Sequence, residues 1–273
     1  MIKLIALDLD GTLLDDERNV PKENKTALRA AADRGVVIVL ASGRMTESIA
    51  PYADVLGIDV QIMGYNGARV VGTAADGRPV LFHRPLRSEY ADYIIEFHED
   101  SGVQLNYYLD EKLYAKNDER MRVWAEFYSD RTKSVVHYVD SLRQFKGSAP
   151  TKLILVSDPD RRNELYDEFR PKLSGTVNVI KTNPEYLEFL HVTVNKGVAL
   201  QGMCDTLGIS INQAMACGDG DNDTEMIAAA GVGVAMSNAS EASLAAADYV
   251  TTNDNNAAGV AEAVEKYVLG GKS

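Results

Sequence analysis

The feature that most constrains the fold is an apolar run at the N-terminus, Lys3–Leu7, which leads into two aspartates, Asp8 and Asp10, and then Gly11. A short apolar run that ends at a glycine turn is typical of a strand buried on both faces of a parallel sheet. Side chains two residues apart on a strand share one face, so the carboxylates lie close together if the backbone stays extended to Asp10. Such a pair needs a cation nearby. Taken alone, the pair is equally consistent with a solvated acidic turn.

Strand and helix patterns alternate in the first part of the chain. Apolar runs suited to buried strands alternate with segments of helical spacing, and Gly35 and Gly57 follow the two helical segments. This βαβαβ order predicts a parallel sheet, because parallel neighbours need a crossover between them. The predicted strands are Lys3–Leu7, Val36–Ala41 and Val60–Met63, and the predicted helices are Lys22–Asp33 and Thr46–Leu56.

The alternation returns near the C-terminus after an interruption of different character. Between residues 83 and 189, tyrosines and charged residues become more frequent, and Val103–Tyr107 alternates polar with apolar residues, as half-exposed antiparallel strands do. We therefore predict a core of residues 1–82 and 190–273 and an inserted α+β domain of residues 83–189. Predicted helices of the insertion are Ser88–Asp100, Asp118–Tyr128 and Pro159–Leu173, and its strands include Thr151–Val156 and Val177–Thr182. In the last part, predicted helices are Lys196–Leu207, Asp223–Ala230, one near Glu241 and one up to Val268, between strands Ala214–Cys217, Val232–Ala235 and Tyr249–Thr251.

The charge balance disfavours several classes of partner. The 273 residues carry 28 Lys and Arg against 40 Asp and Glu, a formal charge of −12, which repels nucleic acid and anionic lipid. No run approaches the roughly 20 apolar residues of a membrane span, and the N-terminus enters a strand without a signal segment. We expect a cytoplasmic protein with no nucleic-acid or membrane partner, while the oligomeric state stays open. Two cysteines, Cys204 and Cys217, are expected to be buried core residues.

A second acidic cluster follows the predicted strand Ala214–Cys217 and contains Asp219, Asp221 and Asp223. Its alternating spacing resembles a calcium-binding EF-hand loop. That alternative fails because the sixth position is Thr224 rather than Gly and the twelfth is Ala230 rather than Glu. Ligands bind beyond the carboxyl ends of parallel strands, so both acidic clusters can face one crevice. Carboxylates from two loops fit Mg²⁺.

Two further strand ends and one helix start contribute polar groups. Ser42 and Gly43 follow the second predicted strand, and glycine there permits close backbone approach to a phosphate. Asn66 follows the third strand and lines the same edge, although each of these residues alone also suits a cap or turn. Lys196 opens a helix, where its charge opposes the helix dipole, so a specific role competes with simple solvation.

Taken together, these segments resemble the haloacid dehalogenase-like phosphohydrolase (HAD) superfamily, and among its members the Cof-type sugar phosphatases. The resemblance covers the whole chain and implies a Rossmann-like, doubly wound α/β core with an inserted α+β cap domain of the C2 type, which selects the substrate. The matching residues are Asp8, Asp10, Gly11, Thr12, Ser42, Lys196, Gly218, Asp219, Asn222 and Asp223, together with Tyr65–Ala68, Val194–Gly197 and Gly231–Met236.

The resemblance also implies roles for these residues. Asp8 is the nucleophile that forms an aspartyl phosphate, and Asp10 is the general acid and base. Mg²⁺ is held by Asp8, the backbone carbonyl of Asp10 and Asp219, while Asp223 orients these ligands from outside. Asp221 matches a variable position of the family and is expected to be a surface acid. The residues expected to contact the phosphoryl group are Ser42, Gly43, Lys196 and Asn222.

The resemblance therefore implies an Mg²⁺-dependent phosphatase that hydrolyses small phosphorylated metabolites, with sugar phosphates as the first expectation. A sugar phosphomutase is the main alternative, and it requires a second phosphate site among the basic residues of the cap. A ligand sensor without activity is the third reading, although no acid of the set is missing. The cap tyrosines Tyr107, Tyr108, Tyr114 and Tyr128 could stack on a substrate ring, but cap core is their more common role.

Overall fold

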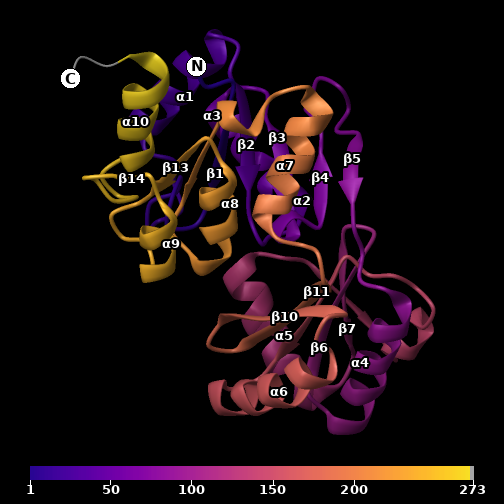
Figure 1. The fold of residues 1–273 in the computed structure, drawn as a ribbon. Helices are drawn as coiled ribbons and strands as arrows, with labels where there is room; N and C mark the ends of the chain where they lie inside the picture. Colours follow the sequence, from indigo (N-terminus) through magenta and orange to yellow (C-terminus); the bar gives the residue numbers. More distant parts are fainter. Residues whose placement is uncertain (271–273) are drawn as a thin grey trace. The chain divides into compact units, whose positions relative to one another are not determined.

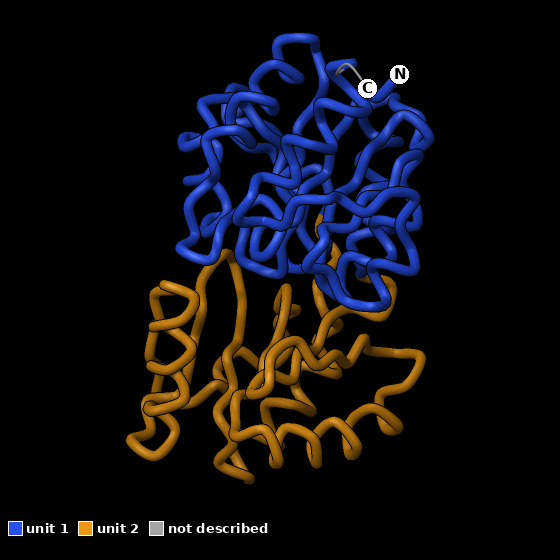
Figure 2. The backbone as a smooth tube through the Cα atoms, turned by 90° about the vertical axis from the view of Figure 1, so that its left-hand side faces the viewer, with its two compact units in different colours: residues 1–82, 195–273 blue, residues 83–194 orange. Residues whose placement is uncertain are grey.

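The computed structural model describes residues 1–270 and divides the chain into two compact units. Unit 1 comprises residues 1–82 and the chain from 195 onward, and unit 2 comprises residues 83–194 (Figure 2). The chain enters unit 2 at the position predicted for the insertion. It returns at Asn195 rather than at residue 190, because strand β11 (Tyr186–His191) still pairs within the sheet of unit 2.

Unit 1 is built on an eight-stranded sheet with the order β14-β13-β12-β1-β2-β3-β4-β5 (Figure 1). Six of these strands run parallel, whereas β4 runs antiparallel to β3. The strand order reverses between β1 and β12, which is the point where open α/β sheets bind ligands. The strands are β1 (Leu4–Asp8), β2 (Val37–Ala41), β3 (Gln61–Gly64), β4 (Arg69–Val71), β5 (Val80–His83), β12 (Ala214–Gly218), β13 (Val232–Ala235) and β14 (Tyr249–Val250).

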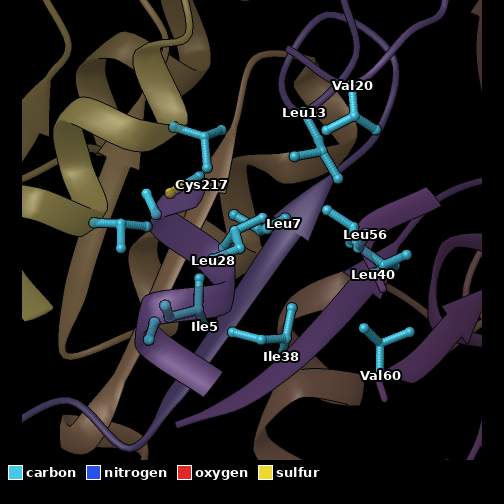
Figure 3. Close-up of a cluster of buried hydrophobic side chains, with 14 of the residues drawn as sticks. Ile5, Leu7, Leu13, Val20, Leu28, Ile38, Leu40, Leu56, Val60 and Cys217 are labelled. Carbon is cyan, nitrogen blue, oxygen red and sulfur yellow. The ribbon is translucent and has the colours of Figure 1, made fainter. Parts of the chain in front are cut away.

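Helices cover both faces of this sheet, because alternate residues of its central strand are apolar on each side. Ile5 and Leu7 of β1 belong to one buried cluster, shown in Figure 3, together with side chains of α1 (Lys22–Asp33) and α10 (Gly259–Val264). Leu4 and Ala6 belong to a second cluster with side chains of α7 (Lys196–Leu207) and α8 (Thr224–Ala229). The doubly wound parallel core expected from the sequence is confirmed.

Several elements of unit 1 differ from the predicted ranges. The predicted helix Thr46–Leu56 is two helices, α2 (Thr46–Ile49) and α3 (Pro51–Leu56), because Pro51 has no backbone N–H to continue the first helix. A 3₁₀ turn at Asp221–Asp223 precedes α8, so that helix begins later than predicted. The remaining helix is α9 (Glu241–Ala246), and the last one continues as a π-helical turn, η5 (Glu265–Leu269).

Unit 2 contains a six-stranded sheet with the order β10-β11-β9-β6-β7-β8. Its strands pair antiparallel except for β7 and β8, which run parallel. The predicted elements of this unit are present, but β7, β8 and β11 are not among them. The strands are β6 (Gln104–Leu109), β7 (Lys112–Lys116), β8 (Val136–Val139), β9 (Lys152–Val156), β10 (Val177–Asn183) and β11, and the helices are α4 (Ser88–Ser101), α5 (Glu119–Thr132) and α6 (Pro159–Lys172).

The two faces of the unit 2 sheet differ in polarity. One face packs Leu105, Leu155 and Phe189 against apolar side chains of α4 and α6. The alternate residues of the same strands include Asn106, Lys152 and Glu188, which are buried and polar, and Lys152 Nζ lies 3.1 Å from Glu188 Oε2. Of the tyrosines expected in the cap core, Tyr107, Tyr108 and Tyr128 are buried, whereas Tyr114 is half-buried.

Two further expectations concern single features of the chain. Cys204 lies in α7 and Cys217 in β12, and both are buried free thiols, as predicted. Within residues 1–270, every helix is too short or too polar to cross a membrane.

Candidate active site

The predicted acids meet in unit 1, at the carboxyl ends of β1 and β12. These strands pair in parallel, with Leu7 opposite Cys217, so Asp8 at the end of β1 stands beside the loop that begins after Gly218. Asp8 is only 6 % exposed and Asp223 only 1 % exposed. The register of two neighbouring strands therefore brings together two acidic segments that are distant in the sequence.

Lys196 connects the two acidic segments. Its Nζ lies 2.5 Å from Asp8 Oδ1 and 2.5 Å from Asp223 Oδ1, and the side chain is fully buried. Burial alone lowers the pKa of a lysine, but the attraction of Asp223 and Asp8 outweighs this effect and raises the pKa of Lys196. The two carboxylates thus explain why a lysine opens α7 against the helix dipole.

Asp219 and its loop are fixed by hydrogen bonds. Thr12 Oγ1 donates to Asp219 Oδ1 at 2.6 Å, while Asp223 Oδ2 accepts from the backbone N–H groups of Asp219 at 3.1 Å and Gly220 at 2.9 Å. Gly11 has a φ of +85°, and a Cβ there would lie 2.3 Å from Asp219 Oδ2. Only glycine fits this position, because a side chain would be strained and would displace the carboxylate.

The donor set at this point fits a hard divalent cation. One carboxylate oxygen from each of Asp8, Asp219 and Asp223 lies within 4.8 Å of the others. Burial and the charge of Asp223 raise the pKa of Asp8 well above its usual range. Burial raises the pKa of Asp219 to about 6, against the hydrogen bond from Thr12. Three acids around one lysine leave uncompensated negative charge, which a bound divalent cation relieves.

The cluster differs from the predicted metal site in one respect. Asp223 is expected to stand outside the ligand set, yet its side chain lies among the clustered carboxylates. Both of its oxygens are already hydrogen-bonded, one to Lys196 and one to the loop amides. Asp8 and Asp219 each accept only one of the hydrogen bonds described above. Asp223 is therefore the most fully hydrogen-bonded of the three carboxylates, whereas Asp8 and Asp219 have more capacity for a cation.

Asp10 pairs with Arg44, a residue that the sequence analysis does not single out. Arg44 Nε donates to Asp10 Oδ2 at 2.8 Å, and its Nη2 donates to Asp10 Oδ1. Arg44 Nη1 also donates to the Tyr52 hydroxyl at 3.3 Å. The Asp10 side chain is half-exposed, whereas that of Arg44 is mostly buried. The only sequence signal was the place of Arg44 directly after Ser42 and Gly43, where a strand end was already expected to contribute polar groups.

Three of the four predicted phosphate-contacting residues, Ser42, Gly43 and Asn222, form a second group, while the fourth, Lys196, lies in the acidic cluster. Ser42 follows β2 and is 3 % exposed, and its Oγ accepts from the backbone N–H of Arg44 at 3.3 Å. Asn222 Nδ2 donates to Asn66 Oδ1 at 3.0 Å, and the Asn66 amide lies against Gly43. Asp221 is exposed, in agreement with its prediction as a surface acid.

Comparison with known proteins identifies the family. The sequence profile of the haloacid dehalogenase-like hydrolases matches residues 5–264. A curated relative, the 5-amino-6-(5-phospho-D-ribitylamino)uracil phosphatase YcsE of Bacillus subtilis, is 31 % identical over 277 residues, covering 98 % of this chain and 96 % of the relative. The HMP-PP phosphatase of Cronobacter sakazakii is 28 % identical over 219 residues, covering 80 % of this chain and 78 % of the relative.

A solved structure agrees with these relatives. The crystal structure of a haloacid dehalogenase-like hydrolase from Bacteroides thetaiotaomicron superposes with a TM-score of 0.88 at 29 % identity, covering 97 % of this chain and 99 % of that chain. The resemblance inferred from the sequence motifs is thereby confirmed. This chain belongs to the haloacid dehalogenase-like hydrolases, as a Cof-type member, and is a phosphatase.

Proposed function

We propose that the protein is an Mg²⁺-dependent phosphomonoester hydrolase that works through an aspartyl phosphate and prefers sugar or sugar-alcohol phosphates. One observation carries the proposal: Asp8 is buried at a strand end, bonded to Lys196, and surrounded by Asp219 and Asp223. A carboxylate in this position is shielded from water but keeps one oxygen available for attack. Such an arrangement suits nucleophilic catalysis of phosphoryl transfer.

In the first step, an oxygen of Asp8 attacks phosphorus and the bond from phosphorus to the ester oxygen breaks. Lys196 holds the other oxygen of Asp8, which fixes the rotamer of the nucleophile. The leaving oxygen takes a proton from Asp10. In the second step, Asp10 takes a proton from water, which attacks phosphorus and releases inorganic phosphate and the free Asp8 carboxylate.

Asp10 needs to change partners during this cycle. In the structure both of its oxygens accept hydrogen bonds from Arg44. Its half-exposed side chain has room to turn toward a leaving oxygen, whereas Arg44 stays anchored to Tyr52. Arg44 therefore holds Asp10 near the site between turnovers.

Mg²⁺ would be held by Asp8, the backbone carbonyl of Asp10 and Asp219, with Asp223 orienting the loop. When bound, it would neutralise charge on the transferring phosphoryl group. Ser42, Gly43, Lys196 and Asn222 would contact the phosphoryl oxygens. Lys196 in particular supplies positive charge inside a protein whose formal charge is −12.

The preferred substrate class is supported by a relative and by the chemistry of unit 2. The name of the Bacillus subtilis relative specifies a phosphate on a ribityl chain, which is a reduced sugar. In unit 2, Gln104 Oε1 and Asn106 Nδ2 are buried on one sheet face without a hydrogen-bond partner among the described residues, and polar atoms of this kind suit hydroxyl groups. We propose that unit 2 is the domain that selects the leaving group.

A phosphate-release screen over phosphorylated metabolites tests this function. Sugar and sugar-alcohol phosphates are compared with flavin mononucleotide and pyridoxal phosphate, each with Mg²⁺ and with a chelator, and Asp8→Asn serves as the blank. We expect Mg²⁺-dependent release from wild-type protein and at least a thousandfold less from Asp8→Asn. Release that survives the chelator contradicts the metal assignment. Release that survives Asp8→Asn contradicts the nucleophile, and an isomerised sugar phosphate without free phosphate indicates a mutase.

A further inference from the structure

The turn after β3 holds an unusual backbone conformation beside the site. Tyr65, Asn66 and Gly67 have φ angles of +52°, +54° and +96° in succession. The first two are not glycine, and side chains in the left-handed region carry a conformational penalty. Both are buried, with Tyr65 fully covered and Asn66 4 % exposed. A strained and buried turn persists only where its surroundings hold it.

Three contacts hold this turn. The backbone N–H groups of Tyr65 and Asn66 donate to the carbonyls of Arg44 at 2.9 Å and Ser42 at 3.0 Å. A Cβ on Gly67 would lie 2.7 Å from the carbonyl oxygen of Asn195, which caps the helix that begins with Lys196. The turn is thus packed between the loop after β2 and the start of α7.

The side chain of Asn66 reaches a third segment. Asn222 Nδ2 donates to Asn66 Oδ1 at 3.0 Å across 156 residues of sequence. A Cβ on Gly43 would lie 3.2 Å from Asn66 Oδ1, so the amide packs on the backbone of the loop after β2. One buried amide therefore touches Gly43 and Asn222, two of the residues assigned to the phosphoryl group.

From these contacts we infer that Asn66 is a positioning residue, which orients the Asn222 amide and fixes its distance from the Ser42–Gly43 loop. The inference rests on the proposed phosphatase site. Asn66 acts through Asn222 and need not touch the substrate itself. The left-handed backbone directs the Asn66 side chain toward Asn222, and this contact is a functional reason for the strained conformation.

The test measures how much Asn222→Ala weakens the binding of inorganic phosphate, first in the wild-type protein and then in Asn66→Gly. Inorganic phosphate is titrated by calorimetry in the presence of Mg²⁺ into wild-type protein, Asn222→Ala, Asn66→Gly and the double variant. Glycine keeps the left-handed backbone but removes the acceptor. We expect Asn222→Ala to weaken phosphate binding about tenfold in the wild-type background and by less than twofold in the Asn66→Gly background.

The controls separate positioning from general loss of structure. Lys133→Gly changes another left-handed residue, at φ +58° in the exposed end of α5, and is expected to leave phosphate binding unchanged. Melting temperatures are recorded for every variant. If Asn66→Gly does not fold, Asn66→Ser, whose hydroxyl is too short to reach Asn222, replaces it with the same expected ratio.

The possible outcomes distinguish this inference from the proposed function. Equal tenfold losses in both backgrounds overturn the role of Asn66, whatever the protein hydrolyses. Phosphate binding by a wild-type protein that hydrolyses no ester overturns the proposed function only, because binding needs no turnover. A wild-type protein that does not bind phosphate overturns both.

Discussion

Each of the two units buries a lysine that forms ion pairs, and the two arrangements differ in the balance of positive and negative charge. In unit 2, Lys152 pairs with Glu188, whose second oxygen accepts from Thr182 at 3.0 Å, so one positive charge meets one negative charge. In unit 1, Lys196 contacts Asp8 and Asp223, and Asp219 lies in the same cluster. Burial of a charged residue alone does not mark a site. An unbalanced buried charge does, because it needs a further cation.

Replacing each lysine in turn tests this difference between the units most strongly. Lys196→Met and Lys152→Met both leave buried carboxylates uncompensated, and we expect each to lower the free energy of unfolding by about 3–5 kcal/mol. Only Lys196→Met is expected to abolish phosphate release from a small generic ester such as p-nitrophenyl phosphate, because Lys196 holds the nucleophile. Urea unfolding and initial rates measure the two effects.

A double variant is the matched control for Lys152→Met in unit 2. Replacing both partners, in Lys152→Met with Glu188→Leu, should restore most of the lost stability, since no buried charge remains. If turnover of the generic ester falls as much in Lys152→Met as in Lys196→Met, the two lysines do not differ in their importance for activity.

The pH dependence of stability tests the charge imbalance in unit 1. The pKa of Asp219 is raised to about 6 in the folded protein from an ordinary value of 3.8. The folded state therefore binds the proton more tightly, and this contribution to stability is present below pH 4 and lost as pH rises to about 6. Without metal, we expect it to amount to roughly 3 kcal/mol, as two pKa units imply. Melting curves with a chelator from pH 4 to 7 measure the slope.

Two changes should reduce the slope of melting temperature against pH. Asp219→Asn removes the titrating group, and Mg²⁺ binds the ionised carboxylates and so stabilises the protein most at the upper end of the range. A slope that stays the same in Asp219→Asn would place the imbalance on other groups of the cluster.

The smallest expected effect lies on the surface of unit 2 and has the opposite sign. Hydrogen bonds from Arg143 and Lys146 lower the pKa of Glu96 to about 2. Its contribution is therefore present above pH 4.5 and lost as pH falls toward 2. We expect Glu96→Gln to lower the melting temperature by no more than about a degree at pH 7, because exposed ion pairs contribute little. The difference should vanish in 1 M NaCl, and a difference that persists there would not be electrostatic.

The sequence predicts most elements of unit 1 because their signals are local. Apolar runs such as Leu4–Asp8 are buried on both faces, and helices such as Lys22–Asp33 show helical spacing and end near glycine. Elements of unit 2 are harder to predict. Strand β7 alternates over only five residues, β8 has no buried residue, and β11 carries Glu188 within an otherwise buried run. None of them shows the continuous apolar run that marks the strands of unit 1.

The candidate site likewise contains residues that the sequence indicates and contacts that it does not. Asp8, Asp219 and Lys196 could be singled out because acids or a lysine at strand ends and helix starts are locally unusual. The pairing of Asp10 with Arg44 and of Asn66 with Asn222 could not be predicted, since these partners lie 34 and 156 residues apart. Nothing in the sequence around any of these four residues specifies the other.

The fold class and the kind of chemistry could be predicted from the sequence, because strand periodicity and the acids that end the strands are properties of short segments. Which of these groups meet depends on the tertiary structure. Lys196 contacts Asp8 across 188 residues because β1 pairs with β12 and α7 packs on the face that Leu4 and Ala6 present. Such contacts depend on strand register and helix packing, which arise from the whole chain.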